Sequence, residues 1–168
     1  MMVEACALSV CVLLLVGLAW YPCCGGGACS LCTGDVPATR TVTLANFTND
    51  TCDNCDDLNA SHVLAFQGPG GDYPCNWLKE GTSTCNGSTY DYTIRLRLNL
   101  QVGGAFWACD LDYGIGESER ILVSYLLDKG PALTVSCTES LSLAYHITTL
   151  DNGACDNLTS TTCNVAAA

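Results

Sequence analysis

The sequence is poor in basic side chains. Among 168 residues it has 6 Lys and Arg against 17 Asp and Glu, which gives a formal net charge of −11. Proteins that bind nucleic acid neutralise phosphates with clustered Lys and Arg, and anionic membrane surfaces attract the same side chains. We therefore expect no nucleic-acid partner, and no attraction of the folded domain to an anionic membrane surface.

Motifs of common enzymes are also missing. The sequence contains no G-x-S-x-G, no P-loop and no H-E-x-x-H, and its two histidines, His62 and His146, both lie in strand-like patterns. The nearest approach to a glycosidase-type pair of carboxylates is the group Asp110, Asp112, Glu117 and Glu119. Arginines are predicted to pair with the first two of these. We expect a protein that is not an enzyme and assign no catalytic residue.

What the sequence does contain is a long alternation of apolar and polar residues. It runs from Tyr90 to Val102 and resumes from Ala105 to Tyr113. A period of two is typical of half-buried strands, and Gly103-Gly104 between the two stretches predicts a hairpin turn. With Val102 opposite Ala105, the register places Leu98 opposite Cys109 and predicts two ion pairs, Arg97–Asp110 and Arg95–Asp112.

Shorter strand patterns occur along the rest of the chain, with turn signals between them. They are predicted at residues 39–47, 62–67, 73–78, 121–127, 133–137, 141–147 and 163–168, with a loop over 79–88. Many short strands of this kind are typical of sandwiches and barrels. We predict an all-β domain over residues 29–168, a single antiparallel β-sandwich of jelly-roll or Ig-like type stapled by cysteines.

The first 28 residues form a hydrophobic leader. Residues 5–21 are uncharged, and Gly26-Gly27-Ala28 resembles a signal-peptidase site, but no Lys or Arg precedes Arg40. Three interpretations are open: a cleaved signal peptide, a retained membrane anchor, and a segment buried against partner subunits. Contact with a membrane is expected only through residues 5–21, if they are retained.

Cysteine is abundant, with 14 in the chain. Such a density indicates disulfides in an oxidising compartment, or metal sites. The pairs Cys29-x-x-Cys32 and Cys52-x-x-Cys55 have the spacing of a four-thiolate zinc site. Neither pair carries the glycine that is usual in a zinc knuckle, so disulfides are the favoured interpretation and zinc is the alternative. For the other six cysteines the simplest pairing is Cys75–Cys85, Cys109–Cys137 and Cys155–Cys163.

Two kinds of surface chemistry are suggested by the polar loops. N-x-[ST] sequons make glycosylation candidates of Asn46, Asn49, Asn59, Asn86 and Asn157. The loop over residues 49–57 carries four Asp side chains that suit calcium, although its spacing is not that of an EF-hand. A solvated acidic loop is the favoured interpretation.

Aromatic side chains offer candidates for a surface contact with a glycan or another protein. Phe106 is out of phase with the buried residues of its strand, and Trp77 lies in a short, weakly patterned strand. Trp107 is in phase with the leucines and is predicted to belong to the core.

Several motifs together give a family resemblance. They are Cys29-x-x-Cys32, Thr41-Val-Thr-Leu44, Cys52-x-x-Cys55-x-x-Leu58-Asn59, Val63-Leu64 and Cys75-x-Trp77. In these the chain resembles small cysteine-rich proteins of aquatic bacteria, planctomycetes especially, and of their phages. The resemblance implies a β-sandwich in an extracellular or virion setting and supplies no catalytic residue.

From these observations we predict a non-catalytic structural protein that is secreted or displayed outside the cytoplasm and self-associates. A virion shell or appendage and a cell-surface filament or coat both fit. The alternatives are a glycan-binding module and an interaction domain that contains zinc.

Overall fold

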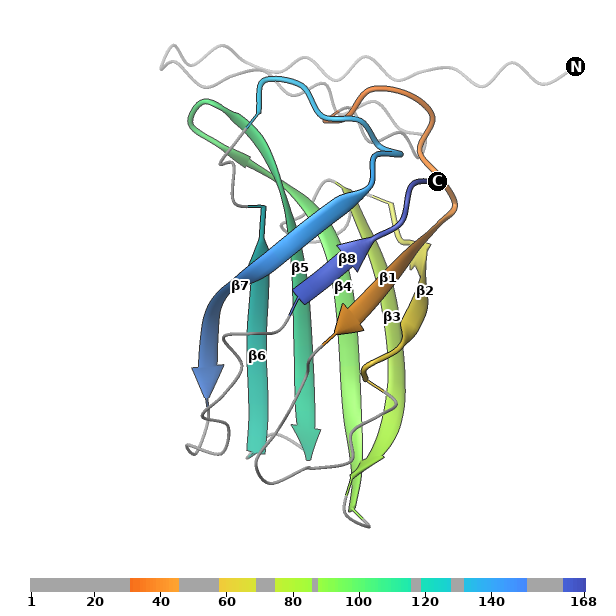
Figure 1. Ribbon diagram of the computed structural model, residues 1–168, viewed down its shortest axis with the longest axis vertical. Coiled ribbons are helices and arrows are strands. Elements are labelled where there is room, and N and C mark those ends of the chain that lie inside the picture. The colour runs from red at the N-terminus through yellow and green to blue at the C-terminus, as the bar shows by residue number, and fades with distance from the viewer. Residues whose placement is uncertain are drawn as a thin grey trace, which may run out of the picture.

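The computed structural model describes residues 31–45, 58–68, 75–85, 88–115, 119–127, 132–150 and 162–168. Within these ranges the chain forms eight strands and no helix, and the strands close into one barrel (Figure 1). In chain order the strands are β1 Thr39–Ala45, β2 Ser61–Phe66, β3 Cys75–Cys85, β4 Ser88–Gln101, β5 Gly104–Ile115, β6 Glu119–Leu126, β7 Leu141–Leu150 and β8 Thr162–Val165.

The all-β prediction is confirmed, but the sandwich is wrong. Each strand runs antiparallel to the next, and the short strand β8 pairs with both β7 and β1. Val165 lies opposite Leu141 on one side and Val42 on the other, so the sheet has no free edge. An alternating strand buries its apolar face equally well against a second sheet or inside its own curled sheet. Here pairing between distant parts of the chain selects the barrel.

The central hairpin is present with a shifted register. Its turn holds Val102 and Gly103, one residue earlier than predicted, and Gly103 has a φ of 101° that other residues rarely adopt. Leu98 therefore lies opposite Trp107 instead of Cys109. Because side chains alternate with a period of two, this two-residue shift leaves every side chain on its predicted face.

Strand β3 is longer than its sequence indicates. Residues 79–85, predicted as loop, continue the strand, and β3 pairs with β4 from Cys75 opposite Leu98 to Cys85 opposite Ser88. Lys79, Glu80 and Gly81 are of types that are depleted in strands, so the strand continues through them because its partner β4 is long and strongly patterned. Tertiary pairing here overrides local preference.

Residues 133–137 do not form the predicted strand. They belong to a segment, residues 132–140, that we call the strap, and it touches its neighbours through two isolated bridges, Thr33–Ser136 and Ala105–Ala132. The strap lies across the end of the barrel near the β4–β5 turn (Figure 1).

Most inward side chains of the barrel are apolar and buried, and most outward ones are polar. The fully buried large side chains include two tryptophans and an arginine as well as aliphatic residues. They are Trp77, Trp107, Arg40, Tyr113, Tyr125, Leu44, Leu58, Leu64, Ile94, Leu96 and Leu98.

The leader over residues 1–28 lies outside the described residues. In the part of the chain that is described, no helix is long and apolar enough to cross a membrane.

Candidate functional site

The strap is anchored to the barrel by backbone hydrogen bonds. Ala105 and Ala132 exchange two, at 2.9 and 2.8 Å, and the backbone N–H of Thr33 donates to Val135 at 2.8 Å. A Cβ on Gly104 would lie 2.2 Å from the Ala132 carbonyl oxygen, so only glycine allows the strap to approach the hairpin this closely. The strap is thereby held at both the β4–β5 turn and the segment before β1.

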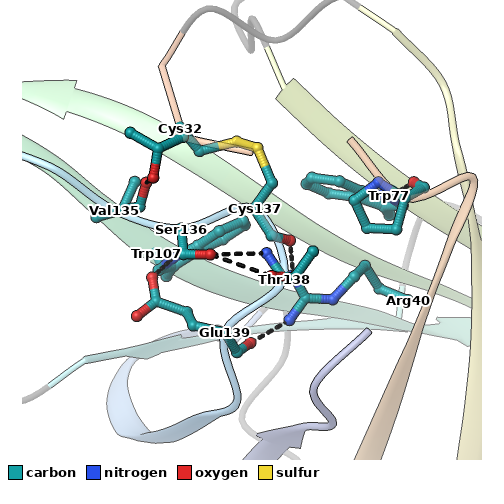
Figure 2. Close-up of a disulfide and its surroundings, with 11 residues drawn as sticks. Cys32, Arg40, Trp77, Trp107, Val135, Ser136, Cys137, Thr138 and Glu139 are labelled. Atoms are coloured by element: carbon teal, nitrogen blue, oxygen red, sulfur yellow. Dashed lines mark hydrogen bonds between the residues drawn. A yellow bond between two sulfur atoms is a disulfide. The ribbon is translucent and has the colours of Figure 1, made fainter. Parts of the chain in front are cut away.

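A disulfide joins the strap to the segment before β1. Cys32 and Cys137 are 105 residues apart in the sequence and have a Cα–Cα distance of 5.1 Å (Figure 2). A second disulfide, Cys109–Cys163, links β5 to β8 with a Cα–Cα distance of 6.6 Å and a separation of 54 residues. The first bond ties an early part of the chain to a late one, and the second crosses the barrel between β5 and β8.

Arg40 fastens the strap from inside the barrel. Its guanidinium donates hydrogen bonds to the backbone carbonyls of Cys137 and Glu139 (Figure 2). It also donates to the backbone carbonyl of Ala166, just after β8. The guanidinium carbon lies 5.9 Å from the ring centroid of Trp77 and 5.6 Å from that of Trp107, a cation–π distance on both sides. A buried charge is stable only when it is compensated in this way.

Two opposing effects set the pKa of Arg40. Burial lowers it below the usual value, and the Glu139 carboxylate nearby raises it. Trp107 Nε1 donates to Glu139 Oε1 at 2.7 Å. The Glu139 carboxylate therefore accepts a hydrogen bond from the Trp107 ring and also offsets the charge of Arg40. Arg40, Trp107 and Glu139 therefore form one structural unit under the strap.

Trp77 is wrong as a surface-contact candidate. Its exposed fraction is 0 %, its Nε1 donates to the Pro37 carbonyl at 2.8 Å, and its ring centroid lies 5.8 Å from that of Trp107. Phe106 is half-buried on the outward side of β5. A flat aromatic platform that uses both side chains is therefore absent from this structure.

The three cysteine pairings predicted from the sequence are wrong. Cys109 bonds to Cys163 and Cys137 bonds to Cys32, so neither Cys109–Cys137 nor Cys155–Cys163 forms. Cys75 and Cys85 stand at the two ends of β3, roughly 33 Å apart at the usual rise of a strand, whereas a disulfide needs Cα atoms within about 7 Å. Cys75 is nonetheless bonded in a disulfide.

The zinc and calcium predictions fall mainly outside the described residues. Of the four predicted thiolate ligands Cys29, Cys32, Cys52 and Cys55, only Cys32 is described, and its sulfur is bonded to Cys137. Within the described ranges no three His, Cys, Asp or Glu side chains form a group that could hold a metal ion. The acidic loop over residues 49–57 is not described.

Of the five sequons, only Asn59 lies in the described residues. It is exposed just before β2, as a glycosylated Asn must be. Asn46, Asn49, Asn86 and Asn157, together with Cys155, lie outside those residues.

A charged hollow of about 360 Å³ lies on the outer face of β3 to β6. In it Arg97 makes a two-pronged ion pair with Asp110, with Nη2–Oδ1 at 3.2 Å, which confirms one predicted pair. Ser124 Oγ also donates to Asp110, at 2.7 Å. In the register of the ladder Asp112 faces Thr93, and Arg95 faces Asp110. Asp110 thus accepts three hydrogen bonds, two from Arg97 and one from Ser124, which is a structural role.

The inward face of β3 carries polar residues away from the strap. Lys79 Nζ lies 3.3 Å from His62 Nδ1, and His62 Nε2 lies 3.2 Å from the Leu58 carbonyl oxygen. The edge of the His62 ring faces Tyr92, with centroids 5.7 Å apart. Sequence reasoning missed Lys79 because it assigned residues 79–88 to a loop. The signal that could have found it is its two-residue spacing from Trp77.

Comparison with known proteins adds no assignment: no family model, curated protein or solved structure matches the chain.

Proposed function

We propose that the chain is a non-catalytic structural protein, a subunit of an assembly outside the cytoplasm such as a virion shell or appendage, or a cell-surface coat or filament. The observation that carries the proposal is the closure of one barrel end by the strap. At this end the thiols of Cys32 and Cys137 are joined in a disulfide, and the guanidinium of Arg40 is hydrogen-bonded to the strap and to the residue after β8. These groups therefore stabilise the fold.

The disulfides support a location outside the cytoplasm. Cys32–Cys137 and Cys109–Cys163 are long-range bonds inside the folded domain, and such bonds persist in oxidising compartments, whereas the cytosol keeps most thiols reduced. An exported or virion-borne subunit must also stay folded without chaperones. Disulfides help it to do so because they restrict the unfolded chain and thereby raise the free energy of unfolding.

The strap end also offers a contact for a second copy of the chain. Val102 at the β4–β5 turn is 98 % exposed, and Leu133 on the strap is 89 % exposed. The Ala105–Ala132 bridge holds the turn and the strap side by side, so the two apolar side chains belong to one end of the barrel. Apolar side chains this exposed favour burial in an interface.

The test is the mass of the native protein. At micromolar concentration, native mass spectrometry and negative-stain imaging should show oligomers, and a double variant with Val102→Asp and Leu133→Asp should be monomeric. Val63→Asp is the matched control, because Val63 is 58 % exposed on β2 and lies on the side of the barrel. A wild-type protein that remains monomeric would contradict the proposal.

A further inference from the structure

The inward face of β3 places a lysine inside the barrel. Along β3, Trp77 and Ser83 are buried, whereas Glu80 and Thr82, on the other phase, are exposed. Lys79 shares the phase of Trp77 and Ser83, so its side chain enters the barrel. It remains half-buried rather than fully enclosed, so solvent and solutes can reach it.

The ammonium of Lys79 has a neutral partner. The Leu58 carbonyl can only accept a hydrogen bond, so His62 Nε2 carries the proton in their 3.2 Å contact. His62 Nδ1 then presents a lone pair, which accepts from Lys79 Nζ at 3.3 Å. Burial is the main reason that the pKa of His62 lies below its usual value, so the ring is neutral at pH 7.

No carboxylate of the described residues compensates this charge. The outward Arg97 has Asp110 as its ion-pair partner, and the buried Arg40 has three carbonyls. The hydrogen bond to His62 occupies one of the three N–H groups of Lys79. Because an inward cation is stabilised by an opposite charge, Lys79 is a place in the described part of the chain where an anion would be stabilised.

Other groups around Lys79 suit an organic anion. Tyr92 lies opposite Gly81, and a Cβ on Gly81 would come within 2.5 Å of the Tyr92 hydroxyl, so the hydroxyl end of the ring lies over the glycine. Ser83 lies four residues farther along the same face of β3, roughly 13 Å from Lys79 at the usual rise of a strand. It is 2 % exposed, and its Oγ has no hydrogen-bond partner among the described residues. We call His62, Lys79, Ser83 and Tyr92 the Lys79 cluster. It combines one cation, hydroxyl groups and an aromatic surface.

We propose that the Lys79 cluster binds a small organic carboxylate inside the barrel, with the carboxylate on the Lys79 ammonium and the apolar body against the Tyr92 ring. In barrels of eight strands the interior is either filled by side chains or holds one small ligand. The proposal goes beyond the structural role above and does not depend on it, since the cluster lies away from the strap.

Calorimetric titration of the native, disulfide-bonded protein at pH 7 tests this, with 2-naphthoate as the probe and 2-naphthamide as its neutral analogue. We expect 2-naphthoate to bind with one-to-one stoichiometry, and 2-naphthamide to bind at least tenfold more weakly. Lys79→Met should weaken naphthoate binding at least tenfold, whereas Lys79→Arg, which keeps the charge, should bind within about threefold of the wild type.

Lys129→Met is the matched control, because it removes the same charge at the other lysine of the chain. It should leave naphthoate binding unchanged, and far-ultraviolet circular dichroism should show that all variants are folded. Equal affinity of wild type and Lys79→Met, equal affinity for acid and amide, or no saturable binding of 2-naphthoate would overturn the proposal. Native mass on the same samples reports assembly separately, so failure of one proposal is distinguishable from failure of the other.

Discussion

The guanidinium carbon of Arg40 lies 5.6 Å from the centroid of the Trp107 ring. Arg40 belongs to β1 and Trp107 to β5, and both side chains also reach the strap: Arg40 through the Cys137 and Glu139 carbonyls, Trp107 through the Glu139 carboxylate. This contact therefore joins opposite parts of the barrel to the segment that covers its end.

Replacing Arg40 should destabilise the fold strongly. Arg40→Met leaves the buried carbonyl of Cys137 and the part-buried hydrogen bonds to Glu139 and Ala166 without their donor. An unsatisfied buried group costs about 1–3 kcal/mol, and the lost cation–π contacts with Trp77 and Trp107 add to this cost. We expect the free energy of unfolding in urea, followed by tryptophan fluorescence, to fall by roughly 3 kcal/mol or more on this basis. Arg40→Lys keeps the charge but lacks the planar guanidinium, so its free energy of unfolding should lie between those of the wild type and Arg40→Met. A loss below about 0.5 kcal/mol, the range of ordinary surface substitutions, would refute this role.

Removal of the Cys32–Cys137 disulfide should lower the free energy of unfolding, because the unfolded chain gains conformational entropy without the bond. The bond closes a loop of 105 residues, for which the chain-entropy model gives about 4–5 kcal/mol. The Cys32→Ser, Cys137→Ser double variant should therefore unfold at a lower urea concentration than the wild type. Full reduction of both proteins with dithiothreitol should remove most of the difference between them. A gap that persists after reduction would show that the serines, rather than the lost bond, cause the effect.

Gly81 and Tyr92 should be coupled energetically. Gly81→Ala would bring a Cβ within 2.6 Å of the ring carbon that bears the Tyr92 hydroxyl, and overpacking of this kind costs about 1–3 kcal/mol. Tyr92→Leu removes the ring that clashes, so Gly81→Ala should cost much less in that background. A double-mutant cycle of unfolding free energies measures the coupling. Additive effects of the two substitutions would mean that the ring does not lie across Gly81.

Stability should fall with acidification through His62. Its pKa in the folded protein is lowered, chiefly by burial and secondarily by Lys79, against the opposing hydrogen bond to Leu58. The unfolded chain therefore takes up a proton first as the pH falls below about 6.5. This stabilisation is complete above that pH and is lost below it, with a slope of at most about 1.4 kcal/mol per pH unit for one proton.

His62→Gln should flatten this part of the curve of unfolding free energy against pH. The same substitution at His146, which is exposed on β7, is the matched control. An unchanged slope between pH 7 and pH 5 in His62→Gln would contradict a neutral, buried His62.

Local sequence patterns predicted most of the strands, but they did not predict that the sheet closes into a barrel. The alternation from Tyr90 to Val102 reports which face of a strand is buried, and Leu96 and Leu98 are indeed fully buried. The same alternation suits a sandwich and a barrel. The choice depends on β8 pairing with β1, and these strands are more than 100 residues apart.

At the strap end, the pattern of a single strand predicts which side chains point inward but not what they contact. Arg40 shares the phase of Val42 and Leu44, so the sequence already marks it as an inward arginine. What it pairs with could not be predicted, because its acceptors are backbone carbonyls of the strap and of the residue after β8. Cysteine pairing is hidden for the same reason, since loop length alone favoured the short and incorrect pairs.

Peptide mapping of the unreduced protein tests the central claim, a barrel closed by long-range disulfides, most directly. After proteolysis under conditions that prevent exchange, mass spectrometry should find one linked peptide pair containing Cys32 and Cys137 and another containing Cys109 and Cys163. A Cys109–Cys137 linkage, or Cys32 recovered as a free thiol from protein purified without reductant, would contradict this account of how the barrel is closed.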